Sequence, residues 1–235
     1  MHGCWVTETA GGAESVALQL LPSCTLSMAD TRIEDSAGVG AFVGAGAVLE
    51  ASSSVMAGHG QCGVMVAGGT LLLSQGRVER NKSFGIVAMG RGSCVSVQDS
   101  ALAGHATHVE VGGGAARLQR TTLGEGAEVG VLGRNCFLHL ADARIADCST
   151  VALRVEDNAA VVGEGVALDG PCSVVCATQS TVTLARVTLR AGSAECHSVI
   201  SQGTGSLVKL DDVTWLGAGG PGAIRELEGG IVQAK

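Results

Sequence analysis

The chain has 235 residues, of which 36 are Gly and 9 are Cys; only 2% are aromatic, and the formal net charge is −7. An acidic chain with no basic run and few aromatic side chains is poorly suited to nucleic acid, so we expect no nucleic-acid partner. It has no stretch of 18 apolar residues, so we expect no membrane span.

Residues 1–14 are rich in Gly and Ala and show no helical period, and we interpret them as a separate N-terminal segment. Residues 1–9 lack the charged and apolar regions of a secretory leader. The cysteine count is odd, and the closest pair, Cys172 and Cys176, is not followed by a His pair, so we expect no zinc site. Reduced, mostly buried thiols are the better interpretation, and they predict an intracellular protein.

The segment 15–215 carries an apolar repeat, with two sets of positions that recur every 21 to 26 residues. The first set is Ile33, Val55, Val78, Leu102, Leu123, Ile145, Leu168, Leu189 and Trp215. The second set is Leu18, Ala41, Val64, Ile86, Val109, Val131, Leu153, Val174 and Val199. Self-similarity at a fixed period of this length indicates a solenoid.

Each period contains short apolar alternations with a spacing of two, such as Leu71 and Leu73, which is the spacing of a strand. Corners such as Gly68-Gly69 separate them and leave segments too short for helices. We therefore predict an all-β fold, a right-handed parallel β-helix of about nine or ten rungs of 21–26 residues. The position before each residue of the first set should face solvent: Arg32, Ser54, Arg77, Ala101, Thr122, Arg144, Ala167, Thr188 and Thr214.

Residues 216–235 are expected to form a partial rung or a cap, because Ile224 and Ile231 continue the apolar pattern. The end of a β-helix exposes unpaired strand groups and an open apolar rung, which invite edge-to-edge association. We therefore expect a protein partner, or chain outside this sequence, to cover at least one end of the solenoid. The alternative is that the terminal residues fold over the ends themselves.

Residues 80–149 resemble the parallel β-helix repeats of the pectin-lyase-like superfamily. Four residues occupy positions of that repeat pattern: Asn81, Gly85, Ile86 and Ala88. The resemblance covers residues 15–215 and implies the fold. It leaves the function open, because the superfamily includes polysaccharide lyases, hydrolases and epimerases, phage tailspikes, and non-catalytic intracellular scaffold or adaptor proteins.

Two motifs test the enzyme hypothesis. Polygalacturonase-like members of the superfamily use a pair of carboxylates, then G-H-G, then R-I-K, and the carboxylates divide acid and base work between them. This chain has Gly58-His59-Gly60 and Asp211-Asp212 in the reverse order, about seven rungs or about 33 Å apart. The two motifs cannot act on one sugar bond, so we interpret the G-H-G as a turn that contains a surface His.

A calcium site would gather carboxylates on neighbouring rungs, because calcium takes six to eight oxygen ligands. The position three residues before the first apolar set holds Asp30, Ser52, Gln75, Asp99, Arg120, Asp142, Gly165, Arg186 and Asp212. The charge alternates from Asp99 through Arg120 to Asp142, which is typical of a solvated ladder rather than a metal site. We interpret the remaining acidic clusters as loop charges: Glu125, Glu128, Glu156 and Asp157.

The other candidate residues fit structural roles. His105 and His108 straddle a corner with no Cys or carboxylate at ligand spacing, so we expect surface or turn histidines. Gly112-Gly113-Gly114 recurs at the corner phase and is not a phosphate loop. We interpret the aromatic residues as core residues rather than sugar platforms: Trp5, Phe42, Phe84, Phe137 and Trp215.

These observations predict no catalytic, carbohydrate-binding or metal-ligating residue, and no cofactor. The preferred function is a non-catalytic β-helix that acts as a scaffold or protein-interaction module, as a structural subunit of a larger assembly. The alternative is a polysaccharide-acting lyase, hydrolase or epimerase, or a carbohydrate-binding module. A dense carboxylate cluster on one face would favour an enzyme, and the sequence does not supply one.

Overall fold

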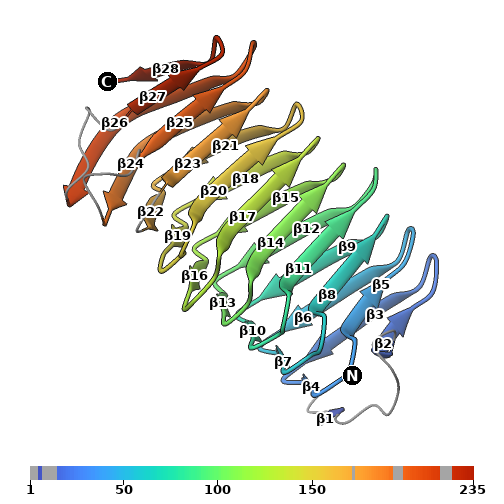
Figure 1. Cartoon of the computed structure of the whole chain (residues 1–235). Coiled ribbons are helices and arrows are strands. Elements are labelled where there is room, and N and C mark those ends of the chain that lie inside the picture. Colours follow the sequence, from blue (N-terminus) through green and yellow to red (C-terminus); the bar gives the residue numbers. More distant parts are fainter. Residues whose placement is uncertain (1–4, 7–14, 171–172, 193–197, 218–223) are drawn as a thin grey trace.

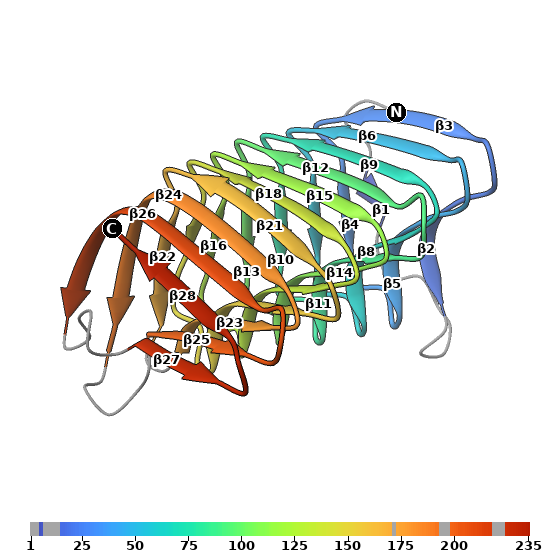
Figure 2. The same cartoon turned by 90° about the horizontal axis from the view of Figure 1, so that it is seen from above.

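The computed structural model describes residues 5–6, 15–170, 173–192, 198–217 and 224–235. These residues form an all-β solenoid of about nine turns, so the predicted right-handed parallel β-helix is confirmed. Figures 1 and 2 show the chain coiling steadily from the N-terminal end (blue) to the C-terminal end (red). No described residue lies in a helix long and apolar enough to cross a membrane.

Each turn has three sides, which we call faces A, B and C. Face A holds β3 (Thr25–Ala29), β6 (Val48–Ser52), β9 (Thr70–Ser74), β12 (Cys94–Gln98), β15 (Ala115–Gln119), β18 (Phe137–Ala141), β21 (Ala160–Glu164) and β28 (Ile231–Ala234). Face B holds β1 (Trp5–Val6), β4 (Arg32–Glu34), β7 (Val55–Ala57), β10 (Arg77–Glu79), β13 (Ala101–Ala103), β16 (Thr122–Gly124), β19 (Arg144–Ile145) and β22 (Ala167–Gly170). The long strands β24 (Thr181–Ala191) and β26 (Leu207–Gly217) pass through faces A and B without a break.

Face C is a separate ten-stranded parallel sheet. It holds β2 (Val16–Leu20), β5 (Val39–Val43), β8 (Cys62–Ala67), β11 (Phe84–Met89), β14 (Thr107–Gly112), β17 (Val129–Arg134), β20 (Val151–Glu156), β23 (Ser173–Thr178), β25 (Val199–Gln202) and β27 (Ile224–Leu227). The last two strands of the chain, β27 and β28, pair in parallel with β25 and β26. Residues 216–235 therefore contribute two strands of a further rung, while the expected covering of an end by a partner stays a prediction.

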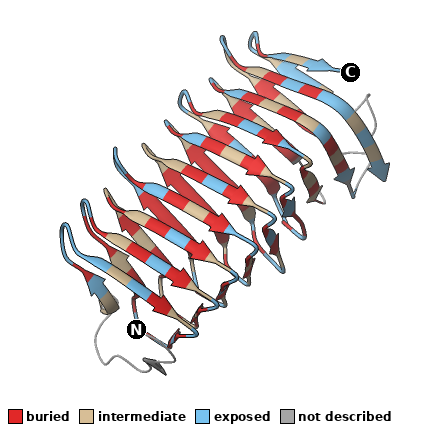
Figure 3. Cartoon of the chain, turned by 180° about the vertical axis from the view of Figure 1, so that it is seen from behind, coloured by how far each residue is buried: buried red, intermediate tan, exposed pale blue. Residues whose placement is uncertain are grey.

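The core consists of aliphatic side chains that stack on their counterparts in the next rung. On face A the inward ladder of Leu49, Leu71 and Val95 is fully buried, and the register continues it through Ala116 and Leu138. Figure 3 shows the result as alternating buried and exposed bands along each strand. Because alternate residues face opposite ways, one strand supplies both the core and the outer surface.

The first apolar set is wrong at one position. Met56, and not Val55, pairs with Ile33 of the preceding rung, and Met56 is fully buried. The cause is the corner before it: Ser53, one residue later than the expected Ser52, adopts the left-handed conformation with φ 48°. The strand that follows therefore starts one residue later.

The second set is also shifted once, because Val175 and not Val174 pairs with Leu153. The position before the first set is at least partly exposed at every rung except one, as predicted. The exception is Ser54, which is buried because its hydroxyl accepts a hydrogen bond from the Thr31 N–H at 3.2 Å. In the observed register Val55 takes that outward position.

Candidate functional site

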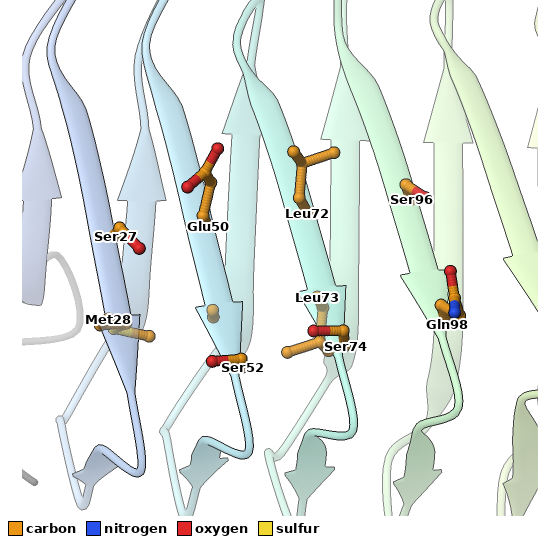
Figure 4. A pocket seen from close by; sticks show the side chains of 10 residues that line it. Ser27, Met28, Glu50, Ser52, Leu72, Leu73, Ser74, Ser96 and Gln98 are labelled. Atoms are coloured by element: carbon orange, nitrogen blue, oxygen red, sulfur yellow. The ribbon is translucent and has the colours of Figure 1, made fainter. Parts of the chain in front are cut away.

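The outer surface of face A is hollowed along the solenoid axis. A first hollow of about 400 Å³ crosses β3, β6, β9 and β12, and Figure 4 shows its side chains on successive strands. The outward residues that line it are Ser27, Glu50, Ser52, Leu72, Ser74, Ser96 and Gln98. Hydroxyl, amide and carboxylate groups therefore recur at the spacing of the strands, beside the side chain of Leu72, which is 39% exposed.

A second hollow of about 520 Å³ continues the first across β12, β15 and β18. Its outward lining is Cys94, Ser96, Ala115, Arg117, Phe137 and His139. Ala115 lies in register between Cys94 and Phe137, and its small side chain leaves the space open. Both hollows share Ser96, so they form one groove over six strands, about 24 Å long at ~4.8 Å per strand. We call it the face A groove.

The charges of the groove are sparse. Glu50 is the only carboxylate and Arg117 the only guanidinium among its lining residues. They occupy the same outward column, with Leu72 and Ser96 between them. The groove is thus weakly acidic at its N-terminal end and basic at the other.

His59 of the G-H-G motif is not a surface residue, which corrects the sequence interpretation. It is 1% exposed and belongs to a polar ladder inside the corner between faces B and C. The Ser36 N–H donates to His59 Nδ1 at 3.1 Å, and the His59 N–H donates to Asn81 Oδ1 at 2.9 Å. The Asn81 N–H in turn donates to His105 Nδ1 at 3.2 Å. We call these four residues the corner ladder.

The corner ladder explains the glycines beside it. A Cβ on Gly85 would lie 2.7 Å from the His105 ring, and a Cβ on Gly60 would lie 2.0 Å from the Ala37 carbonyl oxygen. The space above the backbone is already filled by ladder side chains or by the neighbouring rung. The G-H-G motif is therefore a requirement of the fold.

His105 and His108 are also buried, contrary to the expected surface position. Their rings meet edge to face with centroids 5.3 Å apart. His105 Nε2 donates to the Val78 carbonyl at 3.0 Å, whereas neither ring nitrogen of His108 has a hydrogen-bond partner among the described residues. Burial, helped by the neighbouring His105, lowers the pKa of His108 to about 3. Burial also lowers the pKa of His59 and of His105.

The column that we tested for calcium and interpreted as a charge ladder is a structural corner. Eight of its nine residues adopt left-handed φ values, and at the remaining rung Ser53 does so in place of the expected Ser52: Asp30, Gln75, Asp99, Arg120, Asp142, Gly165, Arg186 and Asp212. Asp tolerates this conformation better than most residues. Arg120 donates two hydrogen bonds, of 2.6 and 2.8 Å, to Asp99 and thereby holds the pKa of that carboxyl at about 2. In the part of the chain that the structure describes, no three His, Cys, Asp or Glu residues could hold a metal ion.

The remaining acidic candidates are dispersed. Asp211 and Asp212 are exposed on β26, far from His59 along the axis. Glu125 and Glu128 are exposed near β16 and β17. Glu156 ends β20 and binds Arg134 at 3.0 Å, so it belongs to an ion-pair network rather than to a loop.

The direction in which a strand presents a side chain corrects several predictions. Phe137, which we interpreted as a core residue, is 48% exposed on face A, and Cys94 is an exception to the expected burial of most thiols. Phe84 packs outside the core, on the outer surface of face C. Trp215 does pack against the core, and Trp5 lies in β1.

Sequence reasoning missed the groove residues Phe137, Arg117 and His139, although a signal was present. Leu138 and Leu140 repeat the apolar alternation of Leu71 and Leu73, and the residues between and before such an inward pair must point outward. Tracing the outward columns instead of the inward ones would have placed Phe137 next to Ala115.

No protein-family model matches the chain, and no curated protein matches it. Among solved structures, the Agl-KA catalytic domain is similar over 100% of this chain and 45% of its own, with a TM-score of 0.52 and 11% identity. The chain thus spans less than half of that protein. Two further structures are more distant. PfbA, a surface adhesin of Streptococcus pneumoniae, matches 99% of this chain and 83% of its own, with a TM-score of 0.38 and 8% identity. The bacteriophage CBA120 tailspike protein 3 matches 95% of this chain and 50% of its own, with a TM-score of 0.32 and 9% identity. The similarity to the Agl-KA catalytic domain supports the β-helix fold and nothing beyond the fold.

Proposed function

We propose that the chain is a non-catalytic glycan-binding module that holds an extended saccharide along the face A groove. The observation that carries the proposal is the continuity of the groove over six parallel strands. An open groove that crosses several strands suits an extended polymer better than a compact small molecule. Its hydroxyl and amide groups match sugar hydroxyls, and Leu72 and Phe137 offer apolar surface to the ring faces of the sugar.

The same geometry argues for binding without hydrolysis. Glycoside hydrolysis uses two carboxylates on either side of the scissile bond, about 5 to 9.5 Å apart. Among the groove-lining residues Glu50 is the only carboxylate, and its register partners Ser27 and Leu72 are neutral. Glu50 can accept hydrogen bonds from a sugar but has no partner there for acid–base work.

A second candidate function is an intracellular scaffold that docks a protein partner on face C. The observation that favours it is a small apolar cluster outside the main core, in which Val39, Cys62 and Val87 are buried and the partly exposed Met65 and Phe84 pack against them. The six described cysteines are free thiols, which supports a reducing compartment: Cys24, Cys62, Cys94, Cys136, Cys148 and Cys176.

A glycan array followed by calorimetry tests the primary proposal. We expect wild-type protein to bind a set of linear oligosaccharides, and Ala115→Trp to weaken that binding at least tenfold because the indole fills the groove. Thr181→Trp is the matched control, since Thr181 lies in the same outward column three strands beyond Ala115, outside the groove. Absence of binding by the wild type, or equal binding by Ala115→Trp, would contradict the proposal. Both variants should keep the wild-type circular dichroism spectrum.

A further inference from the structure

Arg117 is an exposed cation with no ion-pair or hydrogen-bond partner within the described residues. It lies on β15, in register between Ser96 and His139. Eight other arginines each contact a carboxylate: Arg32, Arg77, Arg80, Arg120, Arg134, Arg154, Arg186 and Arg190. Three further described arginines, Arg91, Arg144 and Arg225, also make no ion pair with a described carboxylate. Of these four only Arg117 lines the face A groove, so its guanidinium remains available to a ligand there.

The surroundings of Arg117 supply no carboxylate. The outward positions around it on β12, β15 and β18 are Cys94, Ser96, Gln98, Ala115, Gln119, Phe137, His139 and Ala141. Asp99, at the corner after β12, is already bound by two hydrogen bonds from Arg120. On a chain with a net charge of −7, this is a local patch that attracts anions.

The same place offers apolar and hydrogen-bonding surface. Phe137 is 48% exposed and flanks the hollow above Ala115. His139 lines the hollow with a partly exposed side chain, although its Nδ1 atom is buried and has no hydrogen-bond partner within the described chain. A cation, an aromatic ring and an imidazole thus border one space of about 520 Å³, a size within the range of small-molecule sites.

We propose that this half of the groove is a subsite for a sugar that carries one anionic group, a carboxylate or a sulfate. The inference rests on the proposed glycan-binding function. The planar guanidinium of Arg117 can bind either group through two parallel hydrogen bonds. Phe137 packs against the apolar face of the same sugar ring.

Glu50 limits how densely the ligand can be charged. It lies three strands from Arg117 in the same outward column, about 14 Å away at ~4.8 Å per strand. An acidic group on every sugar would place one against the Glu50 carboxylate, which repels it. The preferred ligand therefore alternates acidic and neutral sugars.

Calorimetry at low ionic strength with defined hexasaccharides tests the inference. The carboxylate arm compares hyaluronan, in which acidic and neutral sugars alternate, with its carboxyl-reduced form and with oligogalacturonate, which is acidic at every residue. The sulfate arm compares keratan sulfate with its desulfated form. In the arm whose anionic group fits the subsite, we expect the acidic glycan to bind at least tenfold more tightly than its neutral form. Added salt should weaken this binding.

Three variants locate the effect. Arg117→Gln should abolish the preference for the acidic glycan, whereas Lys209→Gln should leave it unchanged. Lys209 is the matched control because it lies in the same outward column four strands beyond Arg117, outside the groove. Glu50→Gln should raise the affinity for oligogalacturonate.

The outcomes separate the two proposals. If the wild type binds acidic and neutral forms equally, or if Arg117→Gln keeps the preference, the anionic subsite is wrong while glycan binding stands. If no oligosaccharide binds here or on the array, the glycan-binding function and the subsite both fail. Unchanged circular dichroism of each variant ensures that a loss of binding is not a loss of fold.

Discussion

Lowering the pH from 7 to 5 should destabilise this β-helix through its buried histidines. His108 is fully buried, and in the part of the chain that the structure describes neither of its ring nitrogens has a hydrogen-bond partner. Burial lowers the pKa of this side chain to about 3. In the unfolded chain the pKa of a histidine side chain is about 6.5. Because the folded pKa is the lower one, the unfolded state takes up the proton first. The stability is therefore present above about pH 6.5 and is lost as the pH falls toward the folded value.

The size of the effect follows from these two pKa values. Proton linkage with about 6.5 unfolded and about 3 folded gives a loss of about 2 kcal/mol from His108 alone between pH 7 and pH 5. His59 and His105 act in the same direction, because burial lowers their pKa as well. For both rings the corner ladder gives a geometric reason: Nδ1 accepts a backbone N–H, and a protonated ring could not accept it.

Urea unfolding of the wild type and His108→Leu, followed by circular dichroism at pH 7 and pH 5, isolates the contribution of His108. Leucine keeps a large apolar side chain in place of the ring and cannot take up a proton. We expect the free energy of unfolding of the wild type to fall by about 2 kcal/mol more than that of the variant between the two pH values. His59 is present in both proteins, so its contribution cancels. His105 contacts the replaced ring, so the difference between the two proteins also contains the coupling between these two rings. An equal fall in the two proteins would refute the reasoning.

Two further predictions concern backbone fit and thiol reactivity. In urea unfolding, Gly60→Ala should lower the free energy of unfolding by about 2 kcal/mol or more, because its Cβ would lie 2.0 Å from a backbone carbonyl oxygen. Gly124→Ala is the control and should lower this free energy much less, because the nearest atom to its Cβ would be 3.7 Å away. Maleimide labelling with peptide mapping should modify the exposed Cys94 of the native protein and spare three buried thiols; rapid native labelling of those three would contradict this. The three buried thiols are those of Cys62, Cys136 and Cys148, and burial raises their pKa to about 12, 11 and 12 in that order.

The sequence was enough to predict the solenoid, because the period is carried by the burial of aliphatic side chains. A column such as Val64, Ile86 and Val109 must face inward at every rung, so it leaves a periodic apolar signal. The register slip at Met56 shows the limit of this signal. Val55 and Met56 are both apolar, and only the left-handed corner at Ser53 decides which of them faces the core.

The corner ladder could not be predicted, because its contacts join residues 22 to 24 positions apart through side chains of different types. Ser, His and Asn all occur in the ladder, and its members occupy the same corner on successive rungs. The side chains of His59, Asn81 and His105 each accept a hydrogen bond from a backbone N–H of the preceding rung. The need for these acceptors appears only when the rungs are stacked.

The alternation of each strand also explains why the binding groove can be tested cleanly. On β15, Ala116 and Leu118 point into the core, while Ala115 and Arg117 point out to the groove. In a solenoid, stability is approximately a sum of rung and neighbour terms, and outward side chains contribute little to either. A substitution at Arg117 therefore changes the chemistry of the groove without opening a cavity. A loss of glycan binding in that variant, with unfolding unchanged, would report on recognition by the guanidinium itself.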